Sequence, residues 1–180
     1  LVAILTQWLN ARMRRLESGL TPVATRNHIV VLGWSNRTLP IVGEILQSEG
    51  RVRRFLLRQH AGRLRLVVLC DEVTAWHAQA LRDDPAIGPR GRHIVLRSGT
   101  PLAPDDLERV DPLNAAAIIV PSASTGPTMS ADIATIKALL SLSSHPAAAH
   151  RSLPYVVAEI QDQRKVPIAR RAYRGPLEVV

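Results

Sequence analysis

Short apolar runs alternate with longer amphipathic stretches along most of the chain. The runs are rich in Val, Ile and Leu, which is typical of strands buried on both faces of a sheet. They predict strands at residues 28–32, 64–69, 93–96, 115–120 and 155–160, and the start of a sixth at 177–180. In the stretches between them, apolar residues recur at helical spacing. These helices are expected at residues 38–48, 73–81, 101–110, 130–142 and 164–173.

One segment breaks this alternation. Residues 50–63 are basic and bounded by glycines, and we expect a loop or an extended helix end there. Elsewhere strand and helix follow one another, which is typical of parallel strands joined by right-handed crossovers. The sequence therefore predicts an α/β fold with a doubly wound parallel sheet in the order 3-2-1-4-5 and a sixth strand beginning near Glu178. A ligand site is expected beyond the carboxyl ends of the strands.

The first 27 residues lie outside this pattern, and we expect a helix end and a linker there. Leu1–Leu9 is apolar but far shorter than the roughly 20 residues that a membrane-spanning helix needs. A tryptophan and then three arginines follow, as at the cytoplasmic end of a transmembrane helix. The membrane-proximal candidates are Trp8, Arg12, Arg14 and Arg15. An amphipathic helix packed on its own domain is the alternative, and Gly19 and Pro22 end the helix in either case.

The two ends of the chain suggest a larger subunit. The chain begins with Leu1 and stops where the sixth strand starts. We therefore expect residues 1–27 to connect to an upstream helix. Residues 28–180 are expected to form one Rossmann-type domain, with the subunit continuing well past Val180.

Composition adds two constraints. Hydrophobic residues make up 46% of the chain and aromatic residues only 3%, so the core must be aliphatic. The single cysteine, Cys70, lies within an apolar run. This excludes an internal disulfide and favours a buried thiol in a reducing compartment.

The charge is strongly positive. The formal net charge is +8, and all Lys and Arg residues except Lys137 and Lys165 are arginines. Such a charge raises the question of a nucleic-acid partner. The arginines are scattered, however, with local groups at residues 12–15 and 51–54 instead of one stripe interleaved with aromatic residues. We therefore expect no nucleic-acid partner.

The first predicted strand runs into the turn Gly33-Trp34-Ser35-Asn36-Arg37-Thr38, where a dinucleotide-binding fold carries G-x-G-x-x-G. Only the first glycine, Gly33, is present. Ser35 places a side chain where the backbone must approach a pyrophosphate, and Thr38 widens the contact between helix and strand. The turn therefore predicts that NAD binds weakly or not at all.

Asp71 follows the second strand, where an acidic residue binds the ribose of a dinucleotide in many Rossmann folds. A helix cap or a solvated loop carboxylate explains Asp71 equally well. No catalytic set accompanies it, since neither Tyr155 nor Tyr173 is followed four residues later by a lysine. The histidines show no metal-ligand spacing, and the sequence contains no nucleophile elbow or Walker loop. We expect no catalytic residues, and the sequence leaves a metal site unidentified.

Three segments together resemble the CASTOR and POLLUX ion-channel family and its bacterial relatives. They are His28–Ser35, Arg97–Pro101 and Ala117–Val120. In that family a pore helix leads through a basic linker into a Rossmann domain of the RCK type (regulator of K⁺ conductance), which is similar to TrkA-N domains. The arginine-rich segment from Arg51 to Arg65 departs from the family pattern.

The resemblance implies a tetrameric cation channel of the potassium-channel superfamily in the cell membrane. This part would lie on the cytoplasmic side, in a gating ring of identical subunits held to the membrane by the upstream pore helix. The resemblance also implies a ligand site at the matching motif residues and at the acidic position after the second strand. The candidates are Gly33, Trp34, Ser35, Asn36, Asp71, Arg97, Ser98 and Gly99. The ligand is left open between a nucleotide, a calcium ion and none.

Two functions are therefore weighed. The resemblance favours a regulatory domain that senses a ligand and couples it to the pore without catalysis. The alternative is the nucleotide-binding domain of a soluble NAD(P)-dependent oxidoreductase. An enzyme of that kind should begin near His28 and continue into a catalytic domain.

Overall fold

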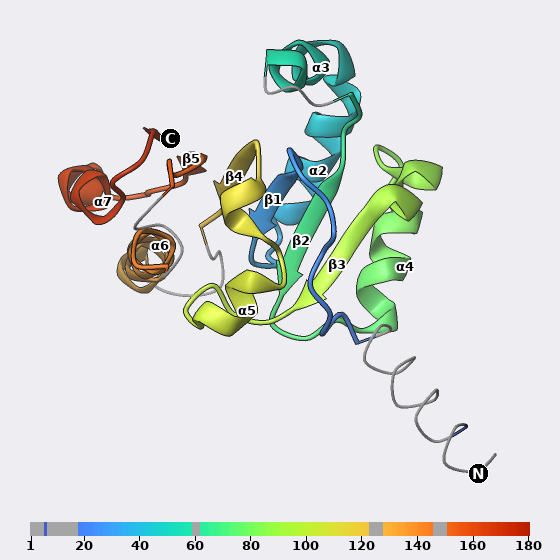
Figure 1. Ribbon diagram of the computed structural model, residues 1–180, viewed down its shortest axis with the longest axis horizontal. Helices are drawn as coiled ribbons and strands as arrows, with labels where there is room; N and C mark the ends of the chain where they lie inside the picture. Colours follow the sequence, from blue (N-terminus) through green and yellow to red (C-terminus); the bar gives the residue numbers. More distant parts are fainter. Residues whose placement is uncertain (1–5, 7–17, 59–61, 123–127, 146–150) are drawn as a thin grey trace.

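A computed structural model describes residues 6, 18–58, 62–122, 128–145 and 151–180 (Figure 1). The membrane-proximal candidates Trp8, Arg12, Arg14 and Arg15 lie outside the described residues, as does almost all of the predicted N-terminal helix. Within the described part of the chain, no helix combines the length and apolar character that crossing a membrane requires.

Six parallel strands form one sheet in the order β3-β2-β1-β4-β5-β6, which confirms the predicted order and the sixth strand. The central strand β1 pairs with β2 on one side and β4 on the other, so Val30 lies beside Val67 and Ile118. The strands are β1 Ile29–Leu32, β2 Leu66–Cys70, β3 Ile94–Ser98, β4 Ala117–Val120, β5 Tyr155–Ala158 and β6 Leu177–Val179.

Helices connect these strands, near the positions that the apolar spacing predicts. The α-helices are α2 Thr38–Gln47, α3 Glu49–Arg58, α4 Ala75–Asp83, α5 Pro104–Glu108, α6 Thr128–Ser143 and α7 Val166–Ala172. Short 3₁₀ turns are η1 Gly88–His93, η2 Pro112–Asn114 and η4 Gln163–Lys165. The arginine-rich segment differs from the expected loop or helix extension, because it holds a separate helix, α3. Val52 and Phe55 are partly buried against the sheet and Leu56 is fully buried there, which fixes this otherwise polar segment as a helix.

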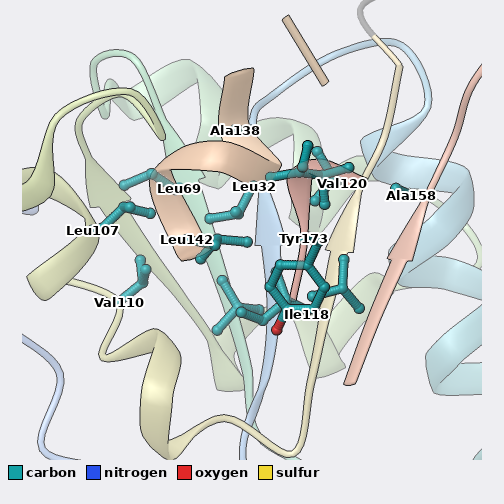
Figure 2. Close-up of a cluster of buried hydrophobic side chains, with 14 of the residues drawn as sticks. Leu32, Leu69, Leu107, Val110, Ile118, Val120, Ala138, Leu142, Ala158 and Tyr173 are labelled. Carbon is teal, nitrogen blue, oxygen red and sulfur yellow. The ribbon is translucent and has the colours of Figure 1, made fainter. Parts of the chain in front are cut away.

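The sheet buries both of its faces. Because successive side chains of a strand point to opposite faces, Val30 and Leu32 enter one core while Ile29 and Val31 enter the other. Helices α5, α6 and α7 cover the first face, and α2, α3 and α4 cover the second. Figure 2 shows the first core, which gathers Leu32, Leu69, Leu107, Val110, Ile118, Val120, Ala138, Leu142, Ala158 and Tyr173.

The linker, residues 18–27, is bonded to the sheet domain along its length. The Val23 side chain is buried in the first core, and its N–H donates to the Arg109 carbonyl at 2.9 Å. Further along, the Asn27 N–H donates to the Asn114 carbonyl at 2.7 Å. The linker therefore lies in a fixed position over the α5 side of the sheet.

Candidate functional site

The turn after β1, residues 33–38 (the Gly33 turn), lies at the carboxyl edge of the sheet. Gly33 has φ +104°, a conformation that L side chains rarely adopt, and its N–H donates to the Leu69 carbonyl at 2.9 Å. A Cβ added to Gly33 would meet nothing within 4 Å. Gly33 therefore makes the turn and leaves open space in front of it, as its place in the glycine motif predicts.

Within the rest of the Gly33 turn, side-chain hydroxyls and backbone N–H groups form hydrogen bonds with one another. The Ser35 N–H donates to the Thr38 hydroxyl at 2.9 Å, and the Arg37 N–H donates to the Ser35 hydroxyl at 3.2 Å. The Thr38 hydroxyl in turn donates to the Gly33 carbonyl at 3.3 Å. Such N–H groups at a helix start would otherwise be available to a phosphate. The two hydroxyls that replace glycines thus occupy donors that a pyrophosphate would need.

A pocket of about 250 Å³ lies beside this turn, at the switch point between β1 and β4 (the strand-end pocket). Residues from the ends of β1, β2 and β4, from the loop after β3 and from α6 line it. Of the sequence candidates, the pocket lining includes Gly33, Trp34, Ser35 and Asp71. Asn36 is exposed outside it, and Arg97, Ser98 and Gly99 lie elsewhere.

Two aromatic residues that the sequence analysis did not single out, Trp76 and His77, pack against Trp34, which forms part of the pocket wall. Trp34 packs edge-on against Trp76 and His77 at the start of α4, with ring centroids 5.9 and 4.6 Å apart. The Trp76 side chain is 63% exposed, which is unusual for so large an apolar group. A tryptophan at the start of a predicted helix, next to the carboxyl edge of the sheet, is the signal that could have identified this aromatic contact.

His77 is held in place by its own helix. The Thr74 N–H donates to His77 Nδ1 at 3.1 Å, so this nitrogen accepts and the ring proton belongs on Nε2. Burial lowers the pKa of His77. A neutral imidazole therefore faces Trp34 at neutral pH.

Ser98 joins the linker to the pocket side of the sheet. Its N–H donates to the Gly19 carbonyl at 3.0 Å, and its hydroxyl donates to the Ser18 carbonyl. The same hydroxyl accepts from the Val73 N–H at 2.8 Å. Val73 belongs to the loop between β2 and α4 that also carries Asp71. The buried Ser98 side chain thus forms hydrogen bonds both to the linker and to a loop that lines the strand-end pocket. We call this set of contacts the Ser98 junction.

Gly99, the residue after Ser98, lies in a tightly packed part of the chain. It has φ +146°, and its N–H donates to the Cys70 carbonyl at 2.7 Å. A Cβ placed on Gly99 would come within 2.5 Å of the Asp106 Cβ. Asp106 also accepts from the Thr100 N–H at 2.8 Å and pairs with Arg109 at 2.8 Å. The residues around Gly99 therefore pack the chain tightly.

Polar side chains also cluster at the ends of β4 and β5. Arg37 from the Gly33 turn pairs with Glu159 at 3.1 Å, and Glu159 accepts from the Ser122 N–H at 3.1 Å. Nearby, buried Asp132 pairs with Lys165 at 2.8 Å. Burial acts to raise the pKa of Asp132, but the hydrogen bonds from Lys165 and from two backbone N–H groups together hold it below its usual value. The Arg37–Glu159 ion pair joins the Gly33 turn to the second half of the sheet.

Two negative observations concern reactive groups. Cys70 is buried, as predicted, and burial, with a smaller effect from Asp71, raises the pKa of its thiol to about 12. Among the described residues, no three His, Cys, Asp or Glu side chains gather where they could hold a metal ion.

Comparison with solved structures identifies the class of fold. The GsuK RCK domain superimposes with a TM-score of 0.55 at 17% identity, covering 95% of this chain and 30% of that one. The GsuK channel bound to NAD matches equally well, with a TM-score of 0.55 at 18% identity over 96% of this chain and 25% of that one. The domain therefore has the Rossmann-like fold of RCK domains.

Sequence comparison points to a particular group of proteins with this fold. None of the known protein-family models matches the chain. The probable ion channel SYM8 of Pisum sativum and the ion channel DMI1 of Medicago truncatula are each 25% identical over 173 residues, which is 94% of this chain. The chain spans only 17% and 18% of their lengths. It is thus a distant homologue of the CASTOR/POLLUX-type ion channels, as the motif resemblance implied.

Proposed function

We propose that the chain is the ligand-sensing, RCK-type regulatory domain of a tetrameric cation channel, acting without catalysis on the cytoplasmic side of the membrane. Its distant homology to two plant ion channels supports this role. The geometry adds an argument of its own, because the connection to any preceding pore helix would run through the linker. A regulatory domain needs a physical path from its ligand site to that linker.

The observation that carries the proposal is the pair of hydrogen bonds that the Ser98 hydroxyl makes. The hydroxyl accepts from Val73 N–H in the loop that holds Asp71, and it donates to the Ser18 carbonyl where the linker begins. A ligand that displaces the Asp71 loop would therefore disturb the first residues of the linker. Such a ligand shifts the domain between two arrangements only by the difference in its affinity for them.

The strand-end pocket supports a small ligand. Its volume of about 250 Å³ lies just below the usual range for ligand sites, which begins at about 300 Å³, so a ligand there would be small. The GsuK structures include complexes with NAD and with ADP, so this fold accommodates nucleotides in another protein. In this chain, the Ser35 and Thr38 hydroxyls occupy N–H donors of the turn. We propose that the pocket binds NAD weakly or not at all and takes a smaller ligand beside Trp34 and Asp71.

Assembly is proposed from apolar side chains on the outer surface. Ile133 and Leu140 of α6 and Ile168 of α7 are 44%, 48% and 53% exposed, and α6 packs against α7. Exposed apolar groups on two adjoining helices favour a protein contact. We propose that identical subunits bury these three residues between neighbours.

The test uses the full-length protein, fractionated and then sized in detergent. The proposal predicts recovery in the membrane fraction as a tetramer. Replacing Ile133 and Ile168 with Asp is expected to weaken the tetramer, because charges would be buried between subunits. The control Leu57→Asp changes an equally exposed leucine on α3, at 58% exposure, and should leave the tetramer intact. Recovery as a soluble monomer would end the channel hypothesis.

A further inference from the structure

A second hollow, the arginine cleft, lies near the amino ends of β2 and β3, away from the strand-end pocket. Its volume is about 470 Å³. Val67 and Val95 form its floor on the α5 side of the sheet, and linker residues 23–25 form one wall. Figure 1 shows this part of the linker passing over β2 and β3. The cleft is thus bordered by the same linker that Ser98 holds at its other end.

The cleft is lined by positive charge. Its basic residues are Arg63, Arg65, Arg92, His93 and Arg97, and none of the described residues that line it is Asp or Glu. The ion pairs among the described residues involve other cations, so none of these four arginines has a carboxylate partner there. Converging cations with low-dielectric walls raise the local concentration of anions.

Arg97 is the deepest of these groups and the least satisfied. It belongs to β3 and is half-buried, and its Nε is buried without a hydrogen-bond partner in the described part of the chain. Its Nη1 donates at 2.8 Å to the carbonyl of the preceding residue, Leu96. Burial lowers the pKa of Arg97. An unpaired buried charge is costly, and an anion in the cleft would remove that cost.

The rim arginines keep donors free for such an anion. Arg65 donates one bond to the Thr25 hydroxyl at 2.8 Å, and Arg92 donates one to His93 Nε2 at 3.2 Å. Each guanidinium carries five N–H donors in a planar fork, which matches the oxygens of a phosphate. The part of the cleft formed by described residues contains no Trp, Tyr or Phe, so these residues offer no such ring on which a nucleobase could stack.

We propose that the arginine cleft binds a small polyanion carrying more than one phosphate group, with Arg97 at its inner end and Arg65 and Arg92 at its rim. The bound anion would touch residues 23–25 and so act on the linker directly. This input is separate from the strand-end pocket and does not depend on the function proposed for it.

Calorimetry of the 180-residue chain with sodium tripolyphosphate tests the site. We expect saturable binding that Arg97→Gln weakens by roughly tenfold or more, through loss of a buried charged hydrogen bond. Arg65→Gln, an exposed position, should weaken binding by roughly tenfold as well and covers the case in which Arg97→Gln fails to fold. The control Arg171→Gln removes the same charge from an exposed position on α7 and should change affinity by less than about twofold.

A second experiment distinguishes a soluble phosphate ligand from a lipid headgroup. Vesicles of phosphatidylcholine doped with a phosphatidylinositol bisphosphate, whose headgroup carries more than one phosphate group, are compared with undoped vesicles by co-sedimentation. Binding of tripolyphosphate alone that depends on Arg65 and Arg97 identifies a soluble phosphate ligand, whereas Arg97-dependent binding to doped vesicles identifies a lipid headgroup. Absence of saturable binding in both experiments, or equal weakening by Arg171→Gln, would overturn the proposal.

Discussion

Two glycine turns at the same edge of the sheet behave in opposite ways. Gly33 and Gly99 both have positive φ, at +104° and +146°. A Cβ on Gly33 would meet nothing within 4 Å, whereas one on Gly99 would collide with Asp106. The Gly33 turn faces the strand-end pocket, and the chain around Gly99 joins the linker to the sheet. Residues that the sequence analysis assigned to one candidate ligand site therefore differ in their packing: the Gly33 turn is open toward the pocket, whereas Gly99 is tightly packed.

The largest expected effect is that of Gly99→Ala. The substitution combines a strained backbone with a Cβ within 2.5 Å of Asp106, so we expect a loss of about 3 kcal/mol in the free energy of unfolding. Urea denaturation of the 180-residue chain measures this loss. A cost below about 1 kcal/mol would show that the Gly99 turn is as open as the Gly33 turn.

Ser98→Ala tests the junction itself. Removing the hydroxyl takes away the acceptor of the Val73 N–H and the hydrogen bond from Ser98 to the Ser18 carbonyl, at a cost of about 2 kcal/mol. Hydrogen exchange at the linker amides Val23 and Asn27 should become faster. The control Ser144→Ala changes an exposed serine and should stay within about 0.5 kcal/mol. Unchanged hydrogen exchange at these two amides would show that Ser98 does not hold the linker in place.

The third prediction concerns the Gly33 turn and NAD. In the natural chain, calorimetry should show no binding near micromolar NAD or NADH. Replacing Ser35 and Thr38 with Gly restores G-x-G-x-x-G and frees the donor N–H groups, so NAD affinity should rise by roughly tenfold or more. Tight NAD binding by the natural chain would revive the alternative of an NAD(P)-dependent oxidoreductase.

The smallest effect is expected for Gly33→Ala. Since a Cβ there meets nothing within 4 Å, only backbone strain remains, at about 1 kcal/mol. The same denaturation series measures it beside Gly99→Ala. A loss as large as that of Gly99→Ala would mean that the Gly33 turn is packed and not open.

The fold followed from the sequence because each strand is a dense apolar run, such as Val30–Leu32, that can only be buried. Helix α3 was harder, since the arginines around its few apolar residues conceal the helical spacing of Val52, Phe55 and Leu56. For such a segment, tertiary burial decides the structure more than local pattern does.

The candidate site was predicted only in part. Gly33 and Asp71 could be placed at the pocket because carboxyl ends of parallel strands share one edge. The hydrogen bond from Ser98 to Ser18 could not be predicted, because it joins residues 80 positions apart through a backbone carbonyl. A sequence pattern carries no signal for a contact of that kind.

The most direct test of the central claim, that the domain controls a pore through the Ser98 junction, is recording of the full-length protein in planar lipid bilayers. Potassium chloride and calcium chloride serve as the charge carriers. We predict ion conductance from the natural protein, an open probability changed by roughly fivefold or more in Ser98→Ala, and no change in Ser144→Ala. Absence of conductance from the natural protein, or identical gating in Ser98→Ala, would contradict the account.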